Sequence, residues 1–182
     1  TPAVVIDWWA HAGGGQAALA RVYPRARLLR VEPANTVPMR TRDSAPWWSA
    51  QRWLRETAAV EDTVVPAAAG QLLWANMMLH AEPDPAALMV RWRRALAVDG
   101  FLMFSTLGPD TLRGLRELHR DAGWGPAHAP FTDMHDLGDM LVAAGFADPV
   151  MDQERLTLTW ATADALLAEL RTLGGNADPA RF

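Results

Sequence analysis

Residues 4–15 read VVIDWWAHAGGG, an apolar run that closes on an acid and is followed by a glycine cluster. Val4–Asp7 has the composition of a buried strand, and Gln16–Tyr23 follows the glycines with the spacing of a helix. Ala26–Val31 (ARLLRV) then predicts a second strand, which ends at Glu32. Strand, turn, helix and strand in this order predict one crossover unit of a largely parallel sheet.

Two acids close these two strands, Asp7 and Glu32, 25 positions apart in the sequence. In a crossover unit, glycines let the backbone approach a ligand, and an acid at the tip of the second strand accepts hydrogen bonds from ribose hydroxyls. A carboxylate at the end of the first strand would face the cationic methionine end of S-adenosylmethionine, whereas it would repel a pyrophosphate. The pattern therefore favours an S-adenosylmethionine site over a dinucleotide site, although both use this spacing.

The glycine cluster departs from the pattern that it resembles. The segment is similar to the first motif of class I S-adenosylmethionine-dependent methyltransferases, in which the acid is followed by three glycines at alternate positions. Trp9 and His11 stand where the first two glycines are expected, and Gly13 stands at the third position. An indole at the point of closest backbone approach would fill space that the cofactor needs, and a Cβ disfavours left-handed dihedral angles. A plain strand-to-helix turn without a ligand therefore stays open as an alternative.

The middle of the chain continues the alternation of strands and helices. Residues 71–76 (QLLWAN) predict a central parallel strand, since they are apolar on both faces. Asp84-Pro85 is typical of a helix start, and Asp99-Gly100 is expected to end that helix before a buried strand at Phe101–Ser105. The apolar face of this helix consists of Leu88, Trp92 and Leu96.

The remaining segments each predict a single element or connection. Residues 33–46 are rich in proline and predict an irregular connection, and Gln51–Thr57 fits a short strand or a helical turn. Thr132 or Asp133 can cap a helix that a left-handed Gly145 ends. The apolar face of that helix consists of Met134, Leu137, Leu141 and Ala144. Arg155–Trp160 (RLTLTW) alternates as a half-exposed strand does, and a last helix is expected at Ala163–Leu173.

Length and composition limit the class of protein. The 182 residues fit one domain, 1–182, and half of them are apolar, as in ordinary globular proteins. The net charge is −4 and no basic stripe is present, so a nucleic-acid partner is not expected. No apolar run is long enough to cross a bilayer and no secretory signal opens the chain, which favours a cytoplasmic protein. Cysteine is absent, which excludes disulfides and thiolate chemistry.

The second half carries a closer resemblance. Residues 104–113 (FSTLGPDTLR), 131–139 (FTDMHDLGD) and 149–152 (PVMD) resemble malonyl-acyl-carrier-protein O-methyltransferase of biotin synthesis, and the likeness continues through 156–160 (LTLTW) to Asn176. It implies a three-layer Rossmann-like class I methyltransferase fold with a mostly parallel sheet. It also implies methyl transfer from S-adenosylmethionine to the free carboxylate of a malonyl thioester on acyl carrier protein. The family has a helical segment before the first strand and a strand after the last helix; both are expected to be missing here.

The resemblance also assigns site residues by position. The reaction asks mainly for alignment and desolvation, because the carboxylate is already a nucleophile and the leaving thioether is neutral. Glu61 or Asp62 would lie near the adenine, Ala75 and Asn76 beside the methyl donor, and Arg113 is the candidate for the malonyl carboxylate. The residues assigned to the cofactor are Asp7, Trp9, His11, Gly13, Glu32, Glu61, Asp62, Ala75 and Asn76.

Two functions from different classes fit these residues. The first is an S-adenosylmethionine-dependent O-methyltransferase that acts on malonyl carrier protein. The second is a non-catalytic relative that keeps the fold and binds a partner, since Trp9 and His11 replace motif glycines and Gln71 stands where an acid is common. An oxidoreductase has support only from the first crossover unit.

Three further groups of residues suggest other sites, and each has a simpler explanation. Two clusters of acids and histidines lack a known ligand spacing, so no metal is predicted. Ser105 has no GxSxG surroundings and is not expected to be a nucleophile. Several tryptophans could wall a substrate site, but core packing is the commoner role. The clusters are His80, Glu82 and Asp84, and Asp133, His135, Asp136 and Asp139; the tryptophans are Trp8, Trp9, Trp47, Trp48 and Trp53.

Overall fold

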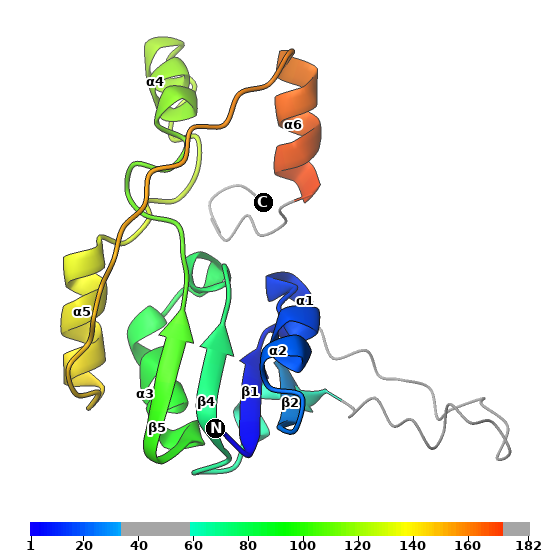
Figure 1. Ribbon diagram of the computed structural model, residues 1–182. Helices are drawn as coiled ribbons and strands as arrows, with labels where there is room; N and C mark the ends of the chain where they lie inside the picture. The colour runs from blue at the N-terminus through cyan, green and yellow to red at the C-terminus, as the bar shows by residue number, and fades with distance from the viewer. Residues whose placement is uncertain (34–58, 173–182) are drawn as a thin grey trace, which may run out of the picture. The chain divides into compact units, whose positions relative to one another are not determined.

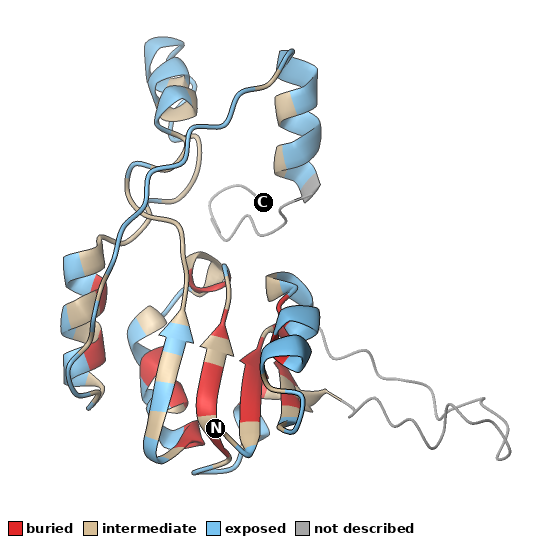
Figure 2. Cartoon of the chain, in the orientation of Figure 1, coloured by how far each residue is buried: buried red, intermediate tan, exposed pale blue. Residues whose placement is uncertain are grey.

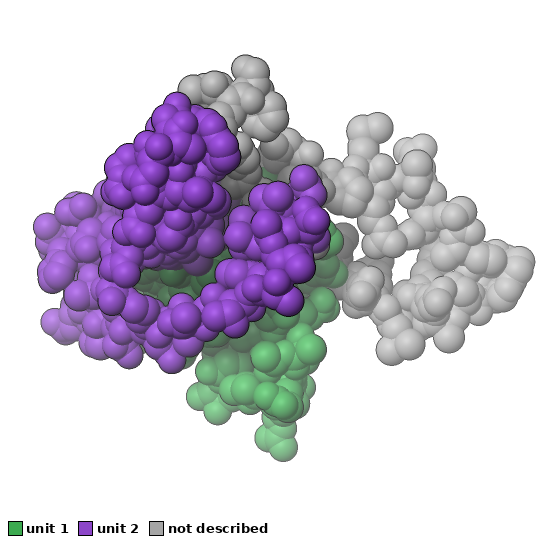
Figure 3. Space-filling model, turned by 90° about the horizontal axis from the view of Figure 1, so that it is seen from above, with its two compact units in different colours: residues 1–79, 86–106 green, residues 80–85, 107–182 purple. Residues whose placement is uncertain are grey.

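A computed structural model describes residues 1–33 and 59–172. The chain divides into two compact units (Figure 3). The first contains residues 1–79 and 86–106, and the second contains residues 80–85 and 107–182. Each unit is described by itself, and the expectation of one domain over 1–182 stays a prediction.

The first unit contains a parallel sheet. Within the described residues it has five strands in the order β3-β2-β1-β4-β5 (Figure 1), and every neighbouring pair is parallel. The chain moves outward from β1 to β2 and β3, then returns to the other side of β1 for β4 and β5, so the order reverses between β1 and β4. The strands are β1 (Val4–Trp8), β2 (Arg27–Glu32), β3 (Val60–Glu61), β4 (Gly70–Ala75) and β5 (Leu96–Phe104). The strands predicted from residues 4–7, 26–31 and 71–76 are confirmed.

Helices cover both faces of this sheet. Val5 of β1 packs with Leu19 of α2 (Gln16–Val22) and Leu72 of β4. Trp8 of β1 points to the other face, since side chains of a strand alternate, and meets Trp92 of α3 (Pro85–Ala95) edge to face with ring centroids 6.4 Å apart. The buried residues in Figure 2 lie mainly along β1, β4 and the inner side of α3. Trp8 is therefore a core residue.

Strand β5 differs from the prediction at its start and in its burial: the strand predicted at Phe101–Ser105 was expected to be buried, but Phe101 and Met103 are each 46% exposed. It begins at Leu96, which pairs with Gly70, and the register then shifts before Leu72 pairs with Phe101. Asp99 lies at the irregularity with φ 59°, so the expected helix end at Asp99-Gly100 is wrong, and α3 ends at Ala95 instead. The error arose because Leu96 is buried and fits the apolar face of a helix as well as that of a strand.

The second unit contains three helices within its described part: α4 (Arg113–Asp121), α5 (Met134–Ala143) and α6 (Ala163–Thr172). The predicted start of α5 is confirmed, because the Asp133 carboxylate accepts the His135 backbone N–H at 2.8 Å. The predicted left-handed Gly145 is confirmed at φ 89°. Helix α4 was not predicted.

The predicted strand at Arg155–Trp160 is wrong. These residues form neither helix nor strand, and no described strand pairs with them. Leu156 and Leu158 are exposed, so the alternating pattern does not correspond to one buried face. Alternation alone does not make a strand, because the backbone N–H and C=O groups need a neighbouring strand as partner.

Some expectations fall outside the described residues. They are the connection after Pro33, the element at 51–57, the tryptophans at 47, 48 and 53, and the end of the resemblance at Asn176. Among the helices that the structure describes, none combines the length and the apolar character that crossing a membrane requires.

The contact between Trp8 and Trp92 should be a main source of stability. Trp92 is fully buried and also lies against Phe104, with ring centroids 5.8 Å apart. We expect Trp92→Ala to lower the free energy of unfolding by about 3–5 kcal/mol, since it removes the buried indole and leaves a cavity. Urea denaturation followed by circular dichroism measures the change. Val98→Ala, at a residue 85% exposed, is the control and should change the value by less than about 0.5 kcal/mol. A similar small effect of Trp92→Ala would contradict this description of the core.

Candidate cofactor site

The two predicted acids lie at the same edge of the sheet. Asp7 pairs with Arg30 in the register of β1 and β2, and Glu32 is the last residue of β2. Because the strands are parallel, both carboxylates lie near the carboxyl ends of neighbouring strands. The order of the sheet reverses beside β1, and open α/β sheets bind ligands at such reversals.

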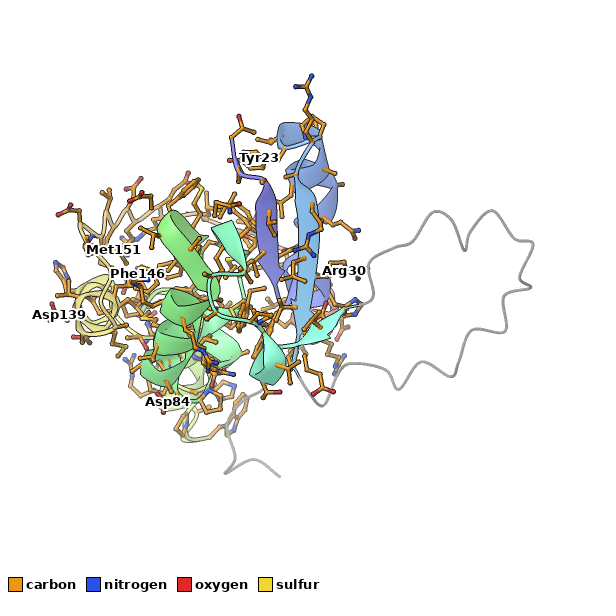
Figure 4. All side chains as sticks on the ribbon, turned by 90° about the horizontal axis from the view of Figure 1, so that it is seen from below. Tyr23, Arg30, Asp84, Asp139, Phe146 and Met151 are labelled. Carbon is orange, nitrogen blue, oxygen red and sulfur yellow. The ribbon has the colours of Figure 1, made fainter. Side chains whose placement is uncertain are left out.

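Asp7 is buried beside another acid. It is 1% exposed, and its Oδ2 has no hydrogen-bond partner among the described residues. Burial, together with the smaller effect of the nearby Glu32 charge, raises the pKa of Asp7 to about 6, and Arg30 opposes the increase. Figure 4 labels Arg30 on β2, the strand beside β1. Ionised Asp7 is therefore costly to the folded chain, and a cation next to it would be stabilised.

Glu32 is also buried, and the loop after β1 contacts it directly. The backbone N–H of His11 donates to Oε1 of Glu32 at 2.9 Å. His11 lies in the short helix α1 (Ala10–Gly13), and its side chain is exposed. A carboxylate has acceptor sites beyond one N–H, so Glu32 retains the chemistry needed to accept hydroxyl donors.

Trp9 has the backbone conformation expected of glycine. Its φ and ψ are both 52°, in the left-handed region, and its N–H donates to the Val31 carbonyl at 2.7 Å. Its indole Nε1 is buried and has no partner in the described part of the chain. A left-handed residue with a Cβ costs on the order of 1 kcal/mol, so Trp9 holds, at that cost, a conformation that glycine adopts freely.

The end of the loop packs tightly against the end of β4. A Cβ on Gly13 would lie 2.8 Å from the carbonyl oxygen of Asn76, which is closer than real contacts allow. The side chain of Asn76 donates from Nδ2 to the Gly13 carbonyl at 2.6 Å. Gly14 has φ 60° and ends α1. Gly13 is thus needed because the backbone of the loop approaches Asn76 closely. Ala75, the residue before Asn76, is the last residue of β4 and is fully buried.

The residues predicted to lie near the adenine follow β3. Glu61 is the last residue of β3 and is in register with Glu32. Asp62 begins the short 3-10 helix η2 (Asp62–Val64), is buried, and forms an ion pair with Arg91 of α3 at 3.0 Å. Since Arg91 forms an ion pair with Asp62, the surroundings of Asp62 differ from those of Glu61.

The nine residues assigned to the cofactor share one location. All of them lie at or soon after the carboxyl ends of β1, β2, β3 and β4.

Arg113 lies in the second unit. It is the first residue of α4, and its Nε is 3.7 Å from the Glu117 carboxylate, one helical turn later. Both side chains are exposed, so this pair contributes little to stability. The role of Arg113 toward a substrate carboxylate stays a prediction.

Other candidate groups have local partners. Asp133 and His135 are joined by the helix cap and by a 2.8 Å contact between Oδ1 and Nδ1. The Asp84 backbone N–H donates to Glu82 at 3.2 Å. Within residues 1–33 and 59–172, no three or more metal-ligating side chains come together in a group that could hold a metal ion.

Two polar residues of this region were not assigned to the site by the sequence analysis. Ser105 follows β5 and donates from Oγ to Oδ1 of Asn76 at 2.7 Å, and Arg91 holds Asp62. Ser105 could have been found by the argument that found Asn76, because both follow the carboxyl end of a parallel strand. Arg91 had no such signal, since it faces Asp62 from a helix.

Comparison with known proteins agrees with this geometry. No family model matches the chain. Curated proteins named malonyl-[acyl-carrier protein] O-methyltransferase are similar: those of Gallionella capsiferriformans (37% identity over 179 residues) and Laribacter hongkongensis (36% over 181) each match 96% of this chain. A third, from Coxiella burnetii, is 41% identical over 106 residues, which is 58% of this chain and 36% of that protein. The chain spans about three fifths of the first two relatives, 62% and 61% of their lengths.

Solved structures show the same fold. PigF with SAH has a TM-score of 0.56 at 16% identity, covering 84% of this chain and 47% of its own. Human N-acetylserotonin methyltransferase in complex with SAM has a TM-score of 0.51 at 17% identity, covering 81% of this chain and 43% of its own. The fold is that of the class I S-adenosylmethionine-dependent methyltransferases, as the sequence predicted. Within that class, the chain is similar in sequence to proteins named malonyl-acyl-carrier-protein O-methyltransferase, and the resemblance drawn from residues 104–113 and 131–139 is confirmed.

The raised pKa of Asp7 predicts a pH-dependent effect on stability. The pKa of Asp7 in the folded chain, about 6, lies above its ordinary value of 3.8. The stability that protonated Asp7 contributes is therefore complete below pH 3.8, and the free energy of unfolding loses this contribution as the pH rises through about 6. Asparagine does not ionise, so Asp7→Asn should raise the free energy of unfolding by about 2–3 kcal/mol at about pH 7.5 and have no such effect below about pH 3.8. Denaturant unfolding at both pH values measures this. Equal free energies of unfolding for Asp7→Asn and the unsubstituted chain at about pH 7.5 would contradict this reasoning. Glu154→Gln, at an exposed acid, is the control.

The left-handed conformation of Trp9 predicts an unusual order of two substitutions. Trp9→Gly and Trp9→Ala both remove the indole, and they differ mainly in the backbone freedom of the new residue. At φ 52° alanine is disfavoured, so the glycine variant should be the more stable by about 1 kcal/mol. Thermal unfolding of the two variants gives the difference. If alanine were the more stable residue, as it is in ordinary helices, the left-handed assignment would be wrong.

Proposed function

We propose that this chain forms part of an S-adenosylmethionine-dependent O-methyltransferase that methylates the free carboxylate of a malonyl thioester on acyl carrier protein. The similar curated proteins carry that name, and this chain matches about three fifths of their length. The observation that carries the proposal is the pair of buried acids, Asp7 and Glu32, at the reversal of a parallel sheet. A site with two buried carboxylates suits a cationic ligand that also has hydroxyl groups.

The residues at the sheet edge fit the cofactor in two respects. Asp7 has an oxygen without a partner among the described residues, and burial makes its charge expensive, so a cationic sulfonium or ammonium group would compensate it. Glu32 already accepts one backbone N–H and can accept the hydroxyl groups of a ribose. S-adenosylmethionine supplies an electrophilic methyl group on a positively charged sulfur.

The protein's part in such a reaction is alignment and exclusion of water. In such a reaction the malonyl carboxylate oxygen would take the methyl group as the bond from sulfur to that methyl breaks and a neutral thioether leaves, so no residue would need to remove or supply a proton. Asp7 and Glu32 would fix the two ends of the donor, and the buried surroundings of Ala75 would keep water from the reacting atoms. Arg113 is proposed to pair with the malonyl carboxylate, which would favour substrate binding.

Trp9 and His11 support the competing function, a non-catalytic relative that binds a partner. Trp9 places a partly buried indole where the motif has its first glycine, and its backbone is left-handed. A cofactor that cannot enter would leave the fold intact and the reaction absent.

Binding of S-adenosylhomocysteine separates the two functions. We expect the purified chain to give a saturable calorimetric trace, and Glu32→Gln to weaken the affinity about tenfold, because an amide accepts ribose hydroxyls less strongly than a carboxylate. Glu154→Gln, at an exposed acid, is the matched control and should leave the affinity unchanged. A flat trace for a folded, unsubstituted chain would support the non-catalytic relative. Equal binding by Glu32→Gln would remove Glu32 from the site.

A further inference from the structure

A chain of hydrogen bonds joins the ends of four neighbouring strands beneath the candidate cofactor site. The Ser105 hydroxyl, after β5, donates to Oδ1 of Asn76, after β4, at 2.7 Å. Nδ2 of Asn76 donates to the carbonyl of Gly13 in the loop after β1, at 2.6 Å. His11, in the same helix α1 as Gly13, donates its N–H to Glu32 at the end of β2. We call this path the Ser105–Glu32 relay.

The direction of each bond in the relay is determined. Only the amide nitrogen of Asn76 can face the Gly13 carbonyl, because two carbonyl oxygens at 2.6 Å would repel each other. The oxygen of the Asn76 side chain must then face Ser105, so the serine hydroxyl has to be the donor. That hydroxyl also accepts the N–H of Met77 at 3.1 Å, which leaves its single proton for Asn76.

The strand ends hold Ser105 in place. Its N–H donates to the Ala75 carbonyl at 3.0 Å, and its carbonyl accepts the Met77 N–H at 2.9 Å. Met77 has φ 49°, so the chain turns sharply after β4 in order to make these bonds. The serine is therefore fixed by the backbone of β4, and its hydroxyl transmits that position to the loop through Asn76.

We propose that Ser105 is a positioning residue for the cofactor loop, a role that rests on the proposed function. Its hydroxyl fixes the side-chain amide of Asn76, and Asn76 fixes the loop whose other end contacts Glu32. The partners of the hydroxyl are Asn76 and Met77, so we assign it a role through Asn76 rather than a contact with the cofactor. It acts by keeping residues 10–15 in the conformation that presents Glu32 and Asp7 to a ligand.

The conservative series Ser105→Ala and Ser105→Thr tests the proposal in the full chain. Hydrogen exchange read by mass spectrometry follows the loop, and calorimetry follows S-adenosylhomocysteine. We expect Ser105→Ala to speed exchange in residues 10–15 and to weaken binding about tenfold, whereas Ser105→Thr, which keeps the hydroxyl, should stay within about twofold of the original. Thr106→Ala removes the neighbouring hydroxyl and should leave both unchanged.

A second variant, Asn76→Asp, keeps the proposal testable if Ser105→Ala fails to fold. It keeps the size of the side chain but cannot donate to the Gly13 carbonyl, so it should release the loop while β4 and β5 keep their protection from exchange. Unchanged loop exchange in both Ser105→Ala and Asn76→Asp would overturn the relay. Faster loop exchange without any binding to the unsubstituted chain would instead overturn the proposed function, and with it the cofactor role of Ser105. A lower melting temperature with unchanged loop exchange and unchanged affinity would reduce Ser105 to a structural residue.

Discussion

The site depends on one constraint, the parallel pairing of β1 with β2 on one side and β4 on the other. This pairing buries β1, and the carboxyl end of β1 lies where the order of the sheet reverses. Asp7 is carried into the interior by its strand, and Glu32 is brought beside it by the register of β2. The loop of α1 then has to cross the ends of the strands in a short space, which explains the left-handed Trp9 and the tight contact of Gly13 with Asn76.

Unfavourable interactions gather at the carboxyl ends of β1 and β2. Asp7 and Glu32 repel each other in a buried setting, and a bulky residue occupies a left-handed position at Trp9. Asp62 is a useful contrast, because it is buried to a similar degree and is paired with Arg91. Asp62 thus has an ion-pair partner, whereas Asp7 has an oxygen without a hydrogen-bond partner among the described residues, which is consistent with a site that a ligand completes. Unfavourable terms of this kind gather at functional sites.

The elements with a strong pattern were predictable from the sequence. The strands at 4–7, 26–31 and 71–76 are short segments rich in apolar residues between turn residues, and α5 has a cap and a left-handed glycine at its ends. Helix α4 escaped prediction because it is short and mostly polar: its nine residues include only two large apolar side chains, Leu115 and Leu118, and none of the nine is buried. The segment 155–160 failed for the opposite reason: it has the alternation of a strand, but no described strand pairs with it.

The candidate site was predictable in part. The glycine motif located Asp7, Gly13 and Glu32, since the position of an acid at a strand end follows from the topology. What the motif could not supply was the side-chain network, because hydrogen bonds such as that of Ser105 to Asn76 join residues that are 29 positions apart in sequence. Spacing identifies the strand ends, and only the folded chain shows which side chains there meet.

The state of Asp7 tests the account most directly. Carbon-13 NMR of the side-chain carboxyl groups can follow the titration of Asp7, with Asp7→Asn used to assign its resonance. The account predicts a pKa of about 6 in the free chain, and a fall in that pKa when S-adenosylmethionine is added, because a cation stabilises the ionised acid. A titration near the ordinary value of 3.8 in the free chain, or a pKa that does not change with the ligand, would contradict it.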